Sequence, residues 1–263
     1  MPDSAAPANR WPGGAAGDAG SPSPPRLGSA SAVEPTPATP TPTAAEPLPA
    51  DLGLVDARTL DRAIAAVSSA DLPTLSTLLK AFGVPAKDLA RLSSAAEGGA
   101  QGKRTPRNMD RDAEEESVVE LLVEVGEDQG GGVRLLCLIW YDSGPTGLRR
   151  IGVHVLDLSN EGCMLPGEAD VSFERVHDAQ YDDAVISWQY NCSHIDSNGV
   201  RVLSVGRQRL DVLLDWLTSS LVLESLEWGE GFPKEARVIT SDPSGATKRL
   251  RRLRFDPSAW RYR

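Results

Sequence analysis

Six strand-like segments follow one another in the second half of this chain, and the connections between them are short. The segments span residues 118–125, 133–141, 150–158, 171–176, 184–191 and 200–205. Turn sequences such as DQGGG, DSGPTG and DSNG separate most of them. Parallel strands need crossovers of a dozen residues or more. The short connections therefore predict an antiparallel meander, closed into a barrel-like sheet.

The second of these segments, residues 133–141, is apolar on both faces. Alternate residues from Cys137 to Tyr141 point one way, and those from Leu136 to Trp140 point the other way. A strand with two apolar faces has to be covered on both sides. We therefore predict that it lies in the middle of the sheet.

Leucines recur at helical spacing in residues 207–226, behind the sixth segment. The apolar stripe consists of Leu210, Leu213, Leu214, Leu217 and Leu221, and Trp216 and Val222 broaden it. This pattern predicts one long helix packed on the sheet. Two more extended segments follow, residues 236–241 and 248–255, joined by the turn SDPSG. The expected fold class is α+β.

The order of a meander followed by one long helix with a tryptophan resembles the topology of the pleckstrin-homology superfold. The likeness covers residues 113–263 and lies in the order of elements, without a shared residue motif. The first hairpin has no cluster of Lys and Arg like the one that holds inositol phosphates in lipid-binding members. The resemblance implies a protein- or peptide-binding module.

Composition divides the chain into four regions. Residues 1–50 hold 12 of the 20 prolines and 12 alanines, whereas only two of the 14 aromatic residues precede position 113. We therefore expect a disordered Pro/Ala-rich arm over 1–50, because it has too few large side chains to offset its ordering entropy. Residues 98–112, GGAQGKRTPRNMDRD, are predicted to be a basic flexible linker, and residues 113–263 an antiparallel α+β domain.

A small helical interaction unit is expected over residues 51–97, with Asp56 and Asp71 as N-caps. Three short helices can bury their apolar stripes only against one another or against a partner, which suggests oligomerisation. The segment LSTLLKAFGVPAKDLARL has the outline of a helix-turn-helix. Leu79 is too large for the close helix contact of that motif, however, and five acids balance five bases over 51–96, so DNA reading is disfavoured.

Several function classes lack their sequence signatures. No apolar run is long enough to span a bilayer, the N-terminus lacks the build of a signal peptide, and three cysteines cannot form a disulfide framework. An intracellular protein, cytoplasmic or nuclear and not secreted, is expected. Nucleophile-elbow, phosphate-loop and dinucleotide-binding motifs are missing, so we expect no enzyme and no cofactor.

The histidines and cysteines do not predict a zinc site. The candidate ligands are Cys163, His177, Cys192 and His194, of which the last two lie on one face of a predicted strand. Structural zinc sites usually have paired ligands at CxxC or HxxxH spacing, which these residues lack. A buried thiol beside an edge histidine explains them better.

The C-terminus has the strongest charge asymmetry. Residues 248–263 hold seven bases and one acid, a net charge of +6, which leaves −16 for the rest of a chain whose total is −10. The candidate polyanion contacts are Lys248, Arg249, Arg251, Arg252, Arg254, Arg261 and Arg263. They suit either a basic edge strand that resists edge-to-edge pairing or a polyanion site, with Trp260 and Tyr262 available for stacking.

Thr105, in the sequence KRTPR, is the best candidate phosphosite. The neighbouring Lys103, Arg104, Arg107 and Arg111 offer a short anion-binding or nuclear-import patch, with a solvated linker as the plainer interpretation.

Two function hypotheses follow from this organisation. The first is a non-enzymatic interaction or structural protein, an adaptor or a viral structural or accessory protein, that acts on protein partners or as a homo-oligomer. The alternative is a nucleic-acid-associated protein that binds through its basic C-terminal segment.

Overall fold

The fold is known from a computed structural model of the chain. The structure describes residues 47–92, 97–110, 112, 114–126, 132–159, 168–192, 195–206, 209–218, 223–241 and 248–263. The predicted arm lies outside these residues except for its last four. Residues 46–263 form one compact unit. It consists mostly of antiparallel sheets with three short helices, and a curled, half-barrel sheet stands where the sequence predicted a barrel-like one.

The helices confirm the predicted positions and caps. They are α1 (Ala57–Val67), α2 (Leu72–Ala81) and α3 (Ala86–Leu89), and a 3-10 turn (Ala90–Leu92) follows α3. The carboxylate of Asp56 accepts a hydrogen bond from the Thr59 amide at 2.7 Å, and that of Asp71 accepts one from the Thr74 amide at 3.0 Å. Each carboxylate thus satisfies a backbone donor that the first helical turn leaves unpaired. No helix among the described residues is long and apolar enough to cross a membrane.

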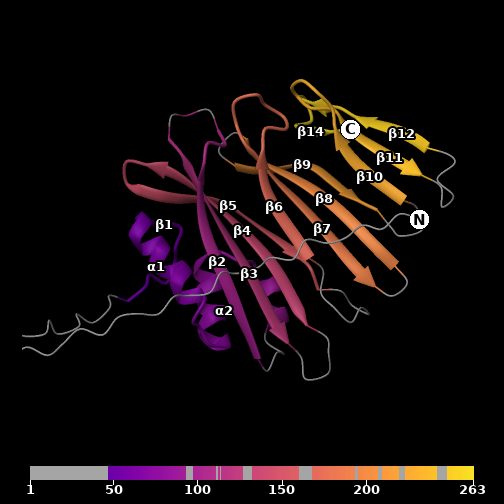
Figure 1. Ribbon diagram of the computed structural model, residues 1–263. Coiled ribbons are helices and arrows are strands. Elements are labelled where there is room, and N and C mark those ends of the chain that lie inside the picture. Colours follow the sequence, from indigo (N-terminus) through magenta and orange to yellow (C-terminus); the bar gives the residue numbers. More distant parts are fainter. Residues whose placement is uncertain are drawn as a thin grey trace, which may run out of the picture. The chain divides into compact units, whose positions relative to one another are not determined.

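Sheet A has the strand order β1-β5-β4-β3-β2, and every pairing in it is antiparallel (Figure 1). Its strands are β1 (Leu54–Val55), β2 (Glu97–Arg107), β3 (Glu116–Gly126), β4 (Val133–Gly144) and β5 (Gly147–Asp157). The central position predicted for residues 133–141 is confirmed by β4. Cys137, Ile139 and Tyr141 pack with the helices, and Leu136, Leu138 and Trp140 pack into a second core on the opposite face.

The predicted flexible linker is wrong over most of its length, because residues 97–107 form the edge strand β2. A Cβ added to Gly98 would lie 2.2 Å from Val125 Cγ1, and one added to Gly102 would lie 2.9 Å from Ile64 Cγ2 of α1. The glycines therefore allow close packing of the helices and of neighbouring side chains against this edge. The apolar faces of α1 and α2 are buried in the same core as β3 and β4, so the helices join the sheet in one unit.

Sheet B has the order β6-β7-β8-β9, and sheet C has the order β10-β11-β12. The strands are β6 (Glu168–Glu174), β7 (Asp183–Cys192), β8 (Ile195–Gly206), β9 (Arg209–Leu217), β10 (Leu223–Trp228), β11 (Ala236–Ser241) and β12 (Lys248–Leu253). A small hairpin pairs β13 (Phe255–Asp256) with β14 (Arg261–Tyr262). One face of sheet B packs on sheet A, and its other face packs on sheet C and this hairpin.

The long helix predicted over 207–226 is absent from the described residues, which form β9 and β10 instead. Leu203 pairs with Val212 and Val202 pairs with Leu214, so Leu213 is an extra, bulged residue. Sheet B is covered on both faces, and the bulge shifts the alternation of its leucines. Together these features produce apolar residues at helix-like spacing. Without that helix, the topological likeness to pleckstrin-homology domains has no basis.

Candidate functional site

The basic C-terminal segment forms the outer strand of sheet C. β12 pairs antiparallel with β11, and no described strand pairs with its other side (Figure 1). The first five residues of β12 are exposed, and only Leu253 is buried. The alternate backbone donors and acceptors along its outer side are therefore available to another chain.

The two faces of β12 carry different side chains. Ala236 pairs with Leu253 and Val238 pairs with Arg251, so Arg249 and Arg251 share a face with the third core. The opposite face presents Lys248, Leu250 and Arg252, and Leu250 is 51% exposed. An exposed leucine between two cations gives this edge an apolar centre.

Some of the predicted polyanion contacts have acidic partners already. Glu235 lies beside three guanidinium groups, with its carboxylate oxygens 3.2 Å from Arg237 Nε, 3.7 Å from Arg252 Nε and 3.3 Å from Arg254 Nε. Desolvation opposes ionisation of this carboxyl, but the hydrogen bonds from Arg237 and Arg254 hold its pKa below its usual value. Arg263 similarly lies 3.2 Å from Asp256.

Four predicted contacts form no ion pair with any acidic side chain that the structure describes: Lys248, Arg249, Arg251 and Arg261. All four are exposed. Three of them lie on β12. The structure therefore concentrates uncompensated positive charge on an open strand edge, whereas the sequence had spread it over the whole segment.

The aromatic residues predicted for stacking pack inward instead. Tyr262 is 7% exposed, and its ring contacts those of Trp228 and Phe255. Trp260 packs edge-on against His177 and lies across Gly206. The phenol of Tyr262 is thus buried in the third core, and the partly buried indole of Trp260 packs against that core.

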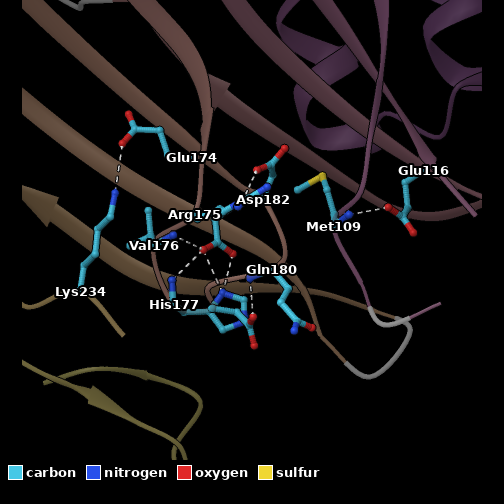
Figure 2. Close-up of polar contacts among 11 residues, drawn as sticks. Met109, Glu116, Glu174, Arg175, Val176, His177, Gln180, Asp182 and Lys234 are labelled. Carbon is cyan, nitrogen blue, oxygen red and sulfur yellow. Dashed lines mark hydrogen bonds and ion pairs between the residues drawn. The ribbon is translucent and has the colours of Figure 1, made fainter. Parts of the chain in front are cut away.

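A buried carboxylate anchors this aromatic cluster. Asp183 is fully buried and accepts hydrogen bonds from the amides of Val176 at 3.1 Å and His177 at 2.9 Å. Figure 2 labels the two donor residues, Val176 and His177. The other oxygen of Asp183 lies 2.7 Å from His177 Nδ1. No motif in the sequence predicts this pair, although the strand start at Asp183 after a polar turn is the position where a carboxylate can accept neighbouring amides.

The candidate phosphosite Thr105 lies inside β2, opposite Val118 of β3, and is partly buried. Its basic neighbours have structural roles. Arg104 forms a bidentate ion pair with Asp61, with N–O distances of 2.8 and 2.9 Å. Arg107 Cζ lies 4.7 Å from the centroid of the Phe173 ring. Arg111 lies outside the described residues. Thr105 is therefore part of a hydrogen-bonded edge strand and not of a flexible linker.

The histidine and cysteine ligands considered for zinc are not assembled in the described residues. Cys163 and His194 lie outside them, and His177 Nδ1 is engaged by Asp183. A different group of possible cation ligands does lie close together: the carboxylates of Asp110, Asp112, Glu116 and Asp142 fall within 4.8 Å of one another. Glu116 accepts a hydrogen bond from the Met109 amide at 2.6 Å (Figure 2). Arg149 forms an ion pair with Asp142, with Nη2 3.0 Å from Oδ2.

Comparison with family models, with curated proteins and with solved structures finds no match to this chain. The function is therefore argued from the residues alone.

Proposed function

We propose that this protein is a non-enzymatic binding protein that adds an acidic, extended protein segment to the open edge of β12. The observation that supports this most strongly is the combination of an unpaired strand edge with the uncompensated cations Lys248, Arg249 and Arg251. An incoming strand would complete the backbone ladder. Its acidic side chains would lie beside the arginines, and an apolar side chain would cover Leu250.

Charge on an edge strand usually prevents aggregation, and that role is compatible with this proposal. Like charges directly opposite each other in paired strands are destabilising, so two copies of β12 repel. The same charges attract an acidic strand. The edge therefore disfavours pairing with a second β12 strand and favours pairing with an acidic strand.

Nucleic-acid binding is the alternative, and the buried ring of Tyr262 and the partly buried ring of Trp260 favour it less. Single-stranded nucleic acids are usually held by aromatic rings that stack on bases, in addition to cations. Within the described residues 248–263, every aromatic ring is at least partly buried, whereas the cations of β12 are exposed. A strand-forming peptide uses both the backbone edge and the charges.

The test measures the binding of labelled probes to the full chain by fluorescence anisotropy. The first probe is an eight-residue peptide that alternates glutamate and valine, and the second has proline in place of valine. Both carry the same charge, but proline lacks the amide donor that a strand ladder needs. We expect the valine peptide to bind at least tenfold more tightly. Equal binding of both, or preferential binding of a uridine oligonucleotide, would refute edge pairing.

The variant Arg249→Gln/Arg251→Gln should weaken binding of the valine peptide by about tenfold, because it removes two cross-strand charge pairs. Arg58→Gln/Lys80→Gln is the matched control. It changes the net charge equally at two exposed helical positions, and we expect it to leave the affinity unchanged.

A further inference from the structure

A second open edge in this protein carries the opposite charge. β6 is the outer strand of sheet B and pairs only with β7 among the described strands. Glu168 and Asp170 are exposed and lie on the face turned away from sheet A, since Ala169 and Val171 between and beyond them pack into the second core. Neither carboxylate forms an ion pair with a described cation.

We propose that the acidic segment that pairs with β12 is β6 of a second copy of this chain. The inference rests on the function proposed above and names its partner. The two edges match in charge and in spacing. Arg249 and Arg251 are two residues apart on one strand face, as are Glu168 and Asp170, and residues at this spacing lie about 7 Å apart in any strand.

One antiparallel register satisfies both charge pairs at once. With Arg249 opposite Asp170, Arg251 lies opposite Glu168, and Leu250 lies opposite Ala169 on the other face. The two carboxylates also line a cavity of about 490 Å³ next to sheet C, which leaves room for long arginine side chains. β12 against β12, or β6 against β6, would instead place like charges opposite each other.

Pairing of β12 with β6 joins two different surfaces, so the contact is heterologous. Each copy that donates β12 keeps its own β6 open, and each copy that accepts keeps its own β12 open. Such a contact builds head-to-tail chains, or rings if the rotation closes. The oligomers should contain fewer copies as the salt concentration rises, because salt screens the attraction between exposed charges; at physiological ionic strength the screening length is about 8 Å.

Strand β10 is another edge of the described structure with an acidic side chain, and it serves as a control. It carries one exposed acid with a described side chain, Glu227, whereas β6 carries two acids at the spacing of the arginines. Glu227→Gln should therefore leave the assembly unchanged.

The experiment is sedimentation velocity of the full chain over a range of concentrations, in low and in high salt. We expect wild-type protein to form oligomers that grow with concentration and dissociate in high salt. The donor variant Arg249→Gln/Arg251→Gln and the acceptor variant Glu168→Gln/Asp170→Asn should each associate at least tenfold more weakly. An equimolar mixture of the two should stop at dimers, because one intact β6 can meet one intact β12 and neither dimer end can continue.

Three results would overturn this inference: a wild-type protein that stays monomeric, oligomers that survive in the acceptor variant, or a mixture that forms no dimers. Circular dichroism checks that each variant is folded. If a double variant is not, Arg251→Gln and Asp170→Asn provide the same comparison with one charge each. The glutamate–valine peptide is titrated into the same samples. A monomeric wild-type chain that binds this peptide would refute the self-pairing and keep the proposed function.

Discussion

Two titratable side chains, the buried Glu116 and the half-buried His154, are expected to give the free energy of unfolding opposite dependences on pH. Glu116 is 1% exposed, and burial raises its pKa to about 7, against a hydrogen bond from the Met109 amide that lowers it; Asp110 and Asp112 raise it further. The ordinary value is 4.5. The folded protein thus holds a proton that the unfolded chain has released between about pH 4.5 and pH 7.

The sign for Glu116 follows from this linkage. The stabilisation of the folded state by protonated Glu116 is fully present below about pH 4.5, and it is lost as the pH rises through about 7. A shift of this size corresponds to about 3 kcal/mol of unfolding free energy. Above that range the loss is complete, and the folded protein contains an ionised, buried carboxylate.

His154 acts in the opposite direction. Burial lowers its pKa to about 4, and the positive charge of Arg201 lowers it further, although Asp215 opposes this. Arg201 Nη1 lies 3.0 Å from His154 Nε2, so the neutral imidazole accepts a hydrogen bond there. Because the unfolded histidine takes up a proton near its ordinary value of 6.5, stability is lost as the pH falls from about 6.5 to about 4. The loss amounts to about 2–3 kcal/mol.

The two dependences overlap between about pH 4.5 and pH 6.5 and largely cancel in the wild-type protein. Glu116→Gln should therefore become more stable relative to wild type as the pH rises, by about 3 kcal/mol across the range. His154→Gln should become more stable relative to wild type as the pH falls. Glutamine can accept the same hydrogen bond at either position, so the variants change the titration more than the packing.

Urea unfolding followed by tryptophan fluorescence, at several pH values for the wild type, both variants and the double variant, measures these differences. The difference between each variant and the wild type isolates one titrating group. A constant difference for Glu116→Gln between about pH 4.5 and pH 7.5 would refute the burial argument for that carboxyl. The same result for His154→Gln between about pH 4 and pH 6.5 would refute the argument that burial and the charge of Arg201 lower the pKa of His154.

Three further predictions concern stability. Asp183→Ala should lower the unfolding free energy by about 3–5 kcal/mol, since it leaves the amides of Val176 and His177 unpaired; wild-type stability in urea would contradict the assigned hydrogen bonds. Gly83→Ala should cost about 1–3 kcal/mol, measured by thermal unfolding, because Gly83 has φ +86° and an added Cβ would lie 2.7 Å from Arg150 Cζ; an unchanged melting temperature would refute this. Asp56→Ala should cost about 1 kcal/mol through the lost cap of α1, and Asp56→Ser should restore most of it in the same assay.

The strands and helices of this protein could be predicted where a local pattern decides the structure. Alternating apolar residues with polar turns between them gave β3, β4, β5, β7, β8 and β11 within a few residues. Aspartates before apolar stripes gave the starts of α1 and α2. In these elements the backbone geometry and the side-chain pattern agree without help from distant residues.

Two elements could not be predicted, because distant packing determines them. β9 carries Leu213 and Leu214 side by side, and only the bulge against β8 and the covering of both faces of sheet B explain this pattern in a strand. β2 contains glycines that are typical of a linker. Gly98 and Gly102 are needed for close approach to the helices and β3, which the sequence alone does not place beside them.

The candidate site was predictable in part. The cations of residues 248–254 and an edge-strand position were both inferred from the sequence, and β12 lies at an edge. The sequence does not show which of these charges have ion-pair partners. The fold of sheet C brings Arg252 and Arg254 close to Glu235. The acids of β6 were not predictable as part of a site, since nothing local marks Glu168 and Asp170 as the charges of an edge strand.

The measurement that tests the central claim most directly is hydrogen exchange, followed by mass spectrometry, with and without the glutamate–valine peptide. A strand added to β12 would bond the amides on its outer side, with which no described strand pairs in the unbound protein. We predict slower exchange in peptides that cover residues 248–253, with no comparable change in α1 or α2. Binding of the peptide without protection of β12 would contradict the claim that this edge is the binding site.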